Sequence, residues 1–129
     1  GLAESAYEKA LVYAREREAF GKSISQFQLI QEKIAEMEMR IQNARLLTYY
    51  ASWRKDQGIP VKKEAAMAKL YSTETATYVV DETTRIFGAY GIAEEYNVER
   101  LYRDARFLLY GGGTSEILKT YIARECLKT

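Results

Sequence analysis

The sequence has 129 residues, a length typical of one domain, and its 47% hydrophobic and 29% charged residues are typical of a globular chain. With 19 basic and 18 acidic residues the net charge is +1, which argues against nucleic acid or an anionic membrane surface as a partner. The absence of histidine excludes Ser-His-Asp catalysis and histidine-based metal sites from the chain, and a single cysteine, Cys126, excludes an internal disulfide.

The first half of the chain predicts two helices. One face of the segment Leu2–Arg17 carries the apolar residues Ala6, Ala10, Tyr13 and Ala14. After a break at residues 20–23, Ser25 and Gln28 predict a capping box for a second helix that continues to about Gln57. Its apolar residues recur at alternating spacings of three and four: Phe27, Ile30, Ile34, Met37, Ile41 and Ala44. Such a seam indicates a long helix packed nearly parallel to its neighbours.

The second half predicts three more helices. They cover Lys62–Phe87, Val98–Leu109 and Ser115–Leu127, the last with Thr114 or Ser115 as its N-cap. No segment shows convincing strand alternation. We therefore predict an all-α fold, an up-down-up-down four-helix bundle in which residues 98–109 form a short connecting helix.

Arg17 is the first candidate for binding chemistry. It stands at the end of the first helix, where a basic residue interacts favourably with the helix dipole and Gly21 then turns the chain. Its planar guanidinium also suits a phosphate, which it would hold through paired hydrogen bonds. Both interpretations fit the sequence.

Two glycine-containing segments are further candidates. Gly88 and Gly91 follow a helix, so they either cap it or let a backbone approach a ligand closely. The run Gly111–Gly113 opens onto a helix N-terminus, whose free N–H groups suit an anionic or polar ligand, although a plain flexible turn has the same pattern. The run lacks the Gly-Lys-Ser/Thr ending of a Walker loop.

The charged short helix and the tyrosines favour packing over catalysis. Helical spacing places Glu99 one turn from Arg103 and Arg100 one turn from Asp104, which predicts a salt-bridged surface or a subunit contact. The 11 tyrosines suit either an interface or the edge of the bundle core, and we expect most of them to line the core.

Six motifs follow one another along the whole chain: Arg17-x-x-Phe20-Gly21-Lys22-x-Ile24-x-x-Phe27-Gln28, Lys63-Glu64-Ala65-Ala66-Met67-Ala68-Lys69, Ile86-Phe87-Gly88-x-x-Gly91, Val98-Glu99-Arg100-x-x-Arg103-Asp104-Ala105, Gly113-Thr114-Ser115-Glu116-Ile117 and Ile122-Ala123-Arg124-Glu125. In this order and spacing they resemble the C-terminal helical domain of the acyl-CoA dehydrogenases. Each motif alone is modest, whereas the ordered set is highly specific.

The resemblance implies that residues 1–129 are one helical domain of a larger three-domain FAD flavoprotein, commonly a homotetramer. It implies that Arg17 meets the FAD pyrophosphate of a neighbouring subunit, with Phe20 and Gln28 beside it. The remaining cofactor contacts that it implies are Arg85, Gly88 and Ala89 in the turn near the dinucleotide, and Thr114 and Glu116 on the adenosine side. Arg124 matches an arginine near the substrate-binding end.

The resemblance also implies a reaction, the α,β-dehydrogenation of an acyl-CoA thioester. In that family a carboxylate removes the α-proton, the β-hydrogen leaves as hydride to the flavin, and an electron-transferring flavoprotein accepts the electrons. The usual Tyr-Glu-Gly-Thr motif supplies the carboxylate, but this chain has Gly112 at the glutamate position. Isovaleryl- and long-chain-specific members take the base from an earlier helix, so we expect it upstream of Gly1 and expect no catalytic residue within the chain.

Two further departures concern the cofactor contacts. Arg85 replaces the glutamine usual before Ile-Phe-Gly and adds charge, and Ala89 replaces the second glycine of that turn and adds bulk. Two other hypotheses stay open: an oxidase-like or flavin monooxygenase-like member of the superfamily, which Gly112 favours, and a non-catalytic helical oligomerisation domain, which the heptad-like spacing and the tyrosines favour. We expect a cytoplasmic protein, or one of the mitochondrial matrix in a eukaryote, and an inactive chain when isolated.

Overall fold

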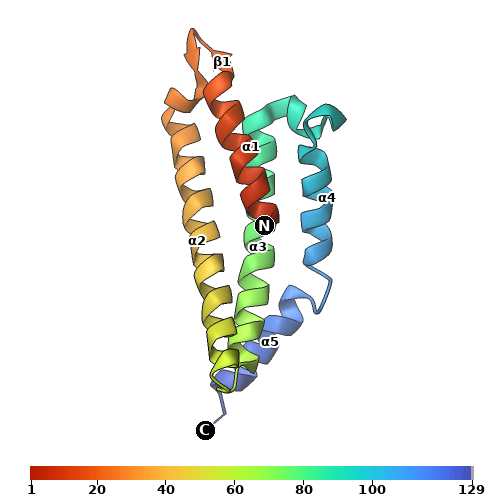
Figure 1. The fold of residues 1–129 in the computed structure, drawn as a ribbon. Coiled ribbons are helices and arrows are strands. Elements are labelled where there is room, and N and C mark those ends of the chain that lie inside the picture. The colour runs from red at the N-terminus through yellow and green to blue at the C-terminus, as the bar shows by residue number, and fades with distance from the viewer. Residues whose placement is uncertain (129) are drawn as a thin grey trace.

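The computed structural model describes residues 1–128, and these form a bundle of five α-helices (Figure 1). In chain order the helices are α1 (Leu2–Glu16), α2 (Gln28–Asp56), α3 (Lys62–Phe87), α4 (Val98–Leu108) and α5 (Ser115–Cys126). The chain ascends in α1, descends in α2, ascends in α3 and descends again through α4 and α5 (Figure 1). The all-α, up-down-up-down class predicted from the sequence is confirmed.

The descending fourth leg is divided between two helices. The helix predicted as a connector, α4, packs along α3 and also contacts α1, whereas α5 packs against α3. The loop between them contains the three consecutive glycines, which have no side chains to continue a helix. α3 is the central helix, because it contacts α1, α2, α4 and α5.

The core is built from small and β-branched side chains. In α1 the residues that face the bundle are alanines, and Ala6, Ala10 and Ala14 are completely buried. Their small size lets α1 approach α3 so closely that the Thr83 hydroxyl lies 3.3 Å from the carbonyl oxygen of Ala6. The largest fully buried side chains are Met37, Val79, Val80, Val98, Thr75 and Thr83.

The tyrosines lie outside this core. None of the 11 is fully buried, and Tyr49, Tyr50, Tyr90, Tyr96, Tyr102 and Tyr110 are exposed. The expectation that most tyrosines line the core is therefore wrong. Close packing against the alanine face of α1 leaves little room for rings between the helices, so they lie along the edges of the bundle.

A short β-hairpin joins α1 to α2, although no strand was predicted. Its strands, β1 (Glu18–Ala19) and β2 (Lys22–Ser23), pair antiparallel with Ala19 opposite Lys22. The two turn residues, Phe20 and Gly21, have positive φ angles of 52° and 78°. Positive φ at both central positions is typical of a tight hairpin turn. Strands of two residues are too short to produce a readable alternation in the sequence.

The predicted capping box at the start of α2 is also wrong. Ser25 lies in a 3₁₀ turn, η1 (Ile24–Gln26), and the N-cap of α2 is Phe27, which offers no side-chain acceptor. The Ser25 hydroxyl instead hydrogen-bonds to the hydroxyl of Ser23 at 2.7 Å, and the carbonyl of Ser25 accepts a bond from the side chain of Gln31. At α5 the predicted cap is confirmed, because the Thr114 hydroxyl accepts from the N–H of Ile117 at 3.4 Å.

Two 3₁₀ segments, η2 (Gly88–Ile92) and η3 (Glu94–Tyr96), connect α3 to α4. This connection packs on the end of α1, where the rings of Tyr13 and Phe87 stack with centroids 4.0 Å apart. Gly91 is buried there, and a Cβ at this position would lie 2.7 Å from the carbonyl oxygen of Thr84. The turn therefore needs glycine at position 91 because of contacts within the chain itself.

Candidate functional site

Arg17, Phe20 and Gln28 lie together around the hairpin at the upper end of the bundle (Figure 1). Arg17 is the C-cap of α1 and has extended backbone angles, so the helix ends there, as the sequence predicted. Its side chain is exposed, and within residues 1–128 its guanidinium has no ion-pair partner. A guanidinium that is free in this way can bind a phosphate.

Phe20 is the most exposed large hydrophobic residue at this end. Its side chain is 95% exposed and its φ of 52° is unfavourable for a residue with a Cβ. The ring contacts Phe27 edge to face, and the ammonium of Lys22 lies 4.4 Å above the Phe27 ring. A strained, exposed aromatic residue stabilises this chain little, which indicates that the ring packs on something outside it.

An open groove of about 740 Å³ lies beside these residues. Phe20, Phe27 and Gln28 line one side, and Ile86 near the end of α3 lines another. The groove thus extends from the hairpin to the last turn of α3, two residues before Gly88. We call the residues Arg17, Phe20, Gln28, Arg85, Gly88 and Ala89 the hairpin-end site.

The turn after α3 shows why Gly88 is a glycine: it is the C-cap of α3, one of the two roles that the sequence allowed. Gly88 has a φ of 62°, and a Cβ built there would meet no atom within 4 Å, so conformation and not crowding requires glycine. Ala89, the next residue, is also exposed. The guanidinium of Arg85 lies 2.8 Å from Asp81 and 3.7 Å from Glu82, and its hydrogen bond to Asp81 raises the pKa of Arg85. Arg85 is therefore already paired with carboxylates.

The second predicted group of contacts lies around the N-terminus of α5. Gly112 and Gly113 have φ angles of 73° and 111°, which L side chains rarely adopt. Hydrogen bonding to its own backbone amide, and then to the Thr114 hydroxyl, lowers the pKa of Glu116. Glu116 is therefore an exposed, ionised acceptor beside a helix N-terminus, suited to hydroxyl or amino donors on a ligand. We call Gly111–Gly113, Thr114 and Glu116 the glycine-loop site.

Arg124 lies in the last turn of α5, where it is exposed, eight residues and so about two turns beyond Glu116 of the glycine-loop site. The short helix α4 has the predicted charge pairs. Arg103 lies 2.6 Å from Glu99 and Arg100 lies 3.9 Å from Asp104. These pairs support the interpretation of α4 as a salt-bridged surface.

The sequence did not single out Lys69 as a site residue, although it lies in one of the six motifs. Its ammonium donates hydrogen bonds to the carbonyls of Gly113 at 2.7 Å and Leu108 at 3.2 Å. The sequence signal that could have revealed Lys69 is its position directly after Ala68, which is buried on the inner side of α3. A lysine there must find acceptors, and carbonyls of the glycine loop supply them.

The hairpin-end site and the glycine-loop site lie far apart. Lys69 marks the height of the glycine loop on α3 and Ile86 marks the groove at the hairpin end, and 17 residues separate them on one helix. At ~1.5 Å per residue the two heights differ by about 25 Å. The two predicted groups of cofactor contacts therefore do not form one compact site within a single chain.

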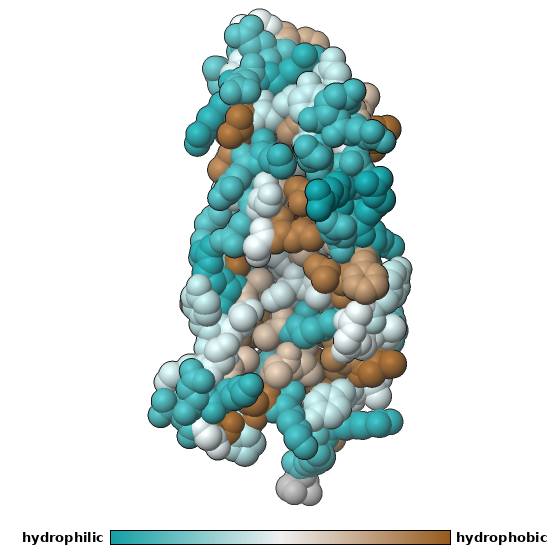
Figure 2. Space-filling model, turned by 45° about the vertical axis from the view of Figure 1, so that its right-hand side comes forward, coloured by the Kyte–Doolittle hydropathy of each residue, from teal (hydrophilic) through white to brown (hydrophobic). Residues whose placement is uncertain are grey.

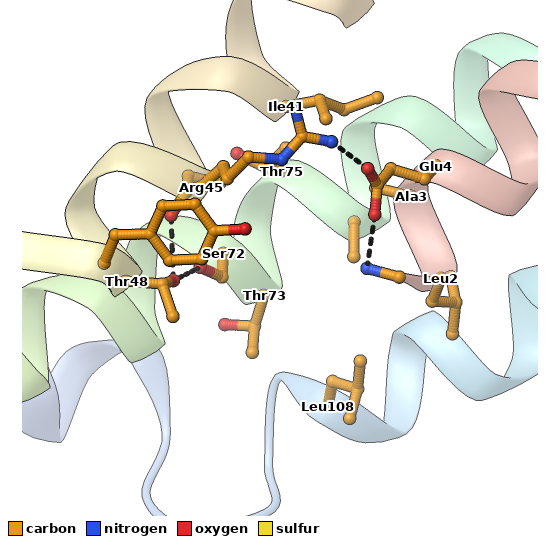
Figure 3. Close-up of a pocket in the computed structure, with 14 residues that line it drawn as sticks. Leu2, Ala3, Glu4, Ile41, Arg45, Thr48, Ser72, Thr73, Thr75 and Leu108 are labelled. Atoms are coloured by element: carbon orange, nitrogen blue, oxygen red, sulfur yellow. Dashed lines mark hydrogen bonds and ion pairs between the residues drawn. The ribbon is translucent and has the colours of Figure 1, made fainter. Parts of the chain in front are cut away.

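A further cavity, of about 340 Å³, lies between the start of α1 and the middle of α2 and α3 (Figure 3). An ion pair between Glu4 and Arg45 crosses its upper edge, and the hydroxyls of Thr48 and Ser72 lie 3.5 Å apart at its left side in this view. The Thr75 hydroxyl is buried without a hydrogen-bond partner. None of the predicted site residues lines this cavity.

Comparison with known proteins identifies the family. The family described as "Acyl-CoA dehydrogenase, C-terminal domain" matches residues 1–127. The chain belongs to this family. Benzylmalonyl-CoA dehydrogenase of Aromatoleum aromaticum is 50% identical over 125 residues, which are 97% of this chain and 33% of that protein. The chain thus spans about a third of the length of this relative.

Solved structures agree with the family assignment. Butyryl-CoA dehydrogenase from Megasphaera elsdenii matches with a TM-score of 0.96 and 38% identity, over 98% of this chain and 33% of that one. The prolyl acyl carrier protein oxidase AnaB matches with a TM-score of 0.94 and 36% identity, over 98% of this chain and 33% of that one. The acyl-CoA dehydrogenase C-terminal fold is therefore shared by proteins that are described as dehydrogenases and as oxidases.

Two sequence expectations concern what this domain lacks. Among residues 1–128, no group of histidine, cysteine, aspartate or glutamate side chains could hold a metal ion. Over the same residues, no helix has the length and apolar character needed to cross a bilayer.

Proposed function

We propose that this chain is the C-terminal domain of an FAD-dependent acyl-CoA dehydrogenase with three domains, and that it supplies flavin contacts and oligomer packing. The observation that carries the proposal is the hairpin-end site: Arg17, whose exposed guanidinium has no ion-pair partner among residues 1–128, and the strained, 95% exposed Phe20 three residues later. Phosphate binding explains the first feature and packing on a ligand or a neighbouring chain explains the second.

Both sites fit parts of a dinucleotide. Arg17 offers a bidentate donor for the pyrophosphate, with Phe20 and Gln28 beside it. Glu116 is ionised, so it repels phosphate and suits the hydroxyl groups of the adenosine side, with Thr114 next to it. Gly88 and Ala89 leave the turn after α3 open to a ligand. Arg85 can contact that ligand only if its guanidinium gives up the ion pair with Asp81.

The separation of about 25 Å along α3 favours two copies of the chain around each FAD. In this arrangement one copy contributes Arg17 and the hairpin end, and its neighbour contributes Thr114 and Glu116. Bound FAD supplies the hydride acceptor for α,β-dehydrogenation. Residues of this chain hold and orient the FAD, and in the proposal Arg124 lies near the end of the site that binds the substrate.

The chain supplies no base for removal of the α-proton. Gly112 has no side chain, and the nearest neighbour of a Cβ built there is Cε of Lys69 at 4.0 Å, which belongs to a cation. A carboxylate from a helix outside residues 1–129 takes this role in the proposal. An acyl-CoA thioester is the proposed substrate and an electron-transferring flavoprotein the proposed electron acceptor, in the cytoplasm or, in a eukaryote, the mitochondrial matrix.

An acyl-thioester oxidase is the second candidate. Gly112 and the likeness to the oxidase AnaB favour it. Oxygen reactivity of the reduced flavin separates the two candidates. Slow reoxidation by oxygen with fast transfer to an electron-transferring flavoprotein supports the dehydrogenase, and the reverse supports the oxidase.

Arg17→Lys tests the hairpin-end site directly. Lysine keeps the positive charge but loses the paired donors, so we expect FAD to bind the full-length apoprotein at least about tenfold more weakly, or about 1.4 kcal/mol. The measurement is a titration of the apoprotein with FAD followed by flavin fluorescence. Arg15→Lys is the matched control, because Arg15 is exposed in the last turn of the same helix. Equal affinities for both variants would exclude a pyrophosphate contact at Arg17.

A further inference from the structure

Lys69 connects three helices at the glycine-loop site. It projects from α3, is partly buried, and its ammonium donates to the carbonyls of Leu108 and Gly113, which are 39 and 44 residues further along the chain. Leu108 is the last residue of α4, and Gly113 directly precedes Thr114, the N-cap of α5. A single ammonium therefore joins α3 to the end of one helix and the start of the next.

The two carbonyls lie at opposite ends of the segment 109–113. The Leu108 carbonyl is among those that a helix C-terminus leaves without a partner inside the helix. Gly113 has a φ of 111° and no side chain to fix its position. Because the ammonium bonds to both, it closes the segment at its two ends, which gives Lys69 a role distinct from that of a surface lysine.

The segment has few other means of fixing its backbone. Three consecutive glycines provide no side chains for packing, and the freedom of their backbone makes an ordered conformation costly in entropy. The N–H groups of Leu109, Tyr110 and Gly111 bond to the carbonyls of Arg106 and Phe107 at 3.0–3.3 Å, and these bonds tie the first three residues of the segment to α4. Around position 112, the side chain of Lys69 is the nearest neighbour, with Cε 4.0 Å from where a Cβ would lie.

We propose that Lys69 is the positioning residue of the glycine loop. It sets the backbone at Gly112 and fixes the N-terminus of α5, and through them it places Thr114 and Glu116. The consequence for the cofactor rests on the proposed function, whereas the clamp itself rests only on the two hydrogen bonds of the ammonium.

Hydrogen exchange of the backbone amides tests the clamp without any ligand. Lys69→Met keeps an unbranched side chain but removes the donor, so exchange of the amides of residues 109–116 in the full-length apoprotein should accelerate at least tenfold, with α1 and α2 unchanged. Lys63→Met is the matched control, because Lys63 is six residues earlier on the same helix. The amides of residues 109–116 in this variant should exchange as in the parent protein. Lys69→Arg, which retains several donors, should restore slow exchange at least in part.

Two results would overturn the clamp. One is unchanged exchange of residues 109–116 in Lys69→Met, and the other is acceleration spread evenly over α1, α2 and α3, which would make Lys69 a general stability residue. A second measurement follows the flavin-loaded protein. Lys69→Met should lower kcat with acyl-CoA at least tenfold while FAD stays bound, and Lys69→Arg should recover most of it.

The two measurements fail separately. If the protein takes up no FAD, the proposed function fails, but the exchange experiment still decides whether Lys69 holds the loop. If exchange responds as expected and kcat does not change, the clamp stands and its part in catalysis is contradicted.

Discussion

At the scale of single residues, Gly91 shows how a sequence motif can have a purely internal cause. Its Cβ would lie 2.7 Å from the carbonyl oxygen of Thr84 and 2.8 Å from Thr84 Cα, and neither backbone atom can rotate away. We expect Gly91→Ala to lower the free energy of unfolding by about 3 kcal/mol, at the upper end of overpacking costs. Denaturant unfolding measures this change.

Gly58→Ala provides the comparison for Gly91. Gly58 has a φ of 70° and open space around it, so alanine there should cost only the conformational term of about 1 kcal/mol. If Gly91→Ala proved no more destabilising than Gly58→Ala, the close approach to Thr84 would not be what requires glycine in the turn.

Tyr78 gives the fold a pH dependence. Burial, followed by the charges of Glu82 and Glu36, raises the pKa of Tyr78 above its ordinary value of 10.0, although Arg40, 4.0 Å over the ring, opposes the rise. A raised pKa in the folded state means that neutral tyrosine stabilises the fold below pH 10 and that this stability is lost as the pH rises further.

Tyr78→Phe removes that titrating group and keeps the ring. Above pH 10 the free energy of unfolding should fall less steeply in this variant than in the parent protein, as measured by denaturant unfolding over a pH series. Tyr110→Phe serves as the control, since Tyr110 is 60% exposed. Equal slopes for the parent protein and Tyr78→Phe would contradict the contribution of Tyr78.

At the scale of elements, α2 has more apolar surface than its own bundle covers. Its stripe of exposed residues consists of Met39, Leu46, Tyr50 and Trp53, which repeat at helical spacing, with Trp53 53% exposed. Hydrophobic surface also shows between hydrophilic side chains on the face seen in Figure 2. This stripe supports the proposal that the protein is a homo-oligomer, with a tetramer as the proposed form.

Trp53→Glu tests the stripe as a subunit contact. A carboxylate in an apolar interface is costly to bury, so we expect sedimentation velocity to show dissociation toward smaller species. Lys55→Glu places the same carboxylate about 200° around the helix from Trp53, away from the stripe, and should leave the assembly intact. An unchanged assembly in Trp53→Glu would place the interface elsewhere.

The elements also show what could be predicted from sequence. The long helices followed from apolar periodicity, because Met37 and Ile41 are buried where the seam of the second helix placed them. The hairpin did not, since two-residue strands held by Phe20 and Gly21 leave no periodic signal. The Ser25 capping box failed because a 3₁₀ turn moved the start of α2 beyond its reach.

The candidate site was less accessible to sequence reasoning than the fold. The resemblance gave its residues, but their distribution over two heights of the bundle and the pairing of Arg85 with Asp81 needed coordinates. Lys69 was missed because its partners are backbone carbonyls, 39 and 44 residues away, which no side-chain pattern reveals.

At the scale of the whole molecule, the proposed flavin contacts lie in two groups about 25 Å apart along α3, and the chain has glycine where the family usually has its base. The measurement that tests this account most directly is anaerobic addition of acyl-CoA thioesters to the flavin-loaded, full-length protein. We predict that a thioester bleaches the flavin absorbance and that the corresponding free acid does not. A protein that binds no FAD, or a bound flavin that no acyl-CoA of any chain length reduces, would contradict the account.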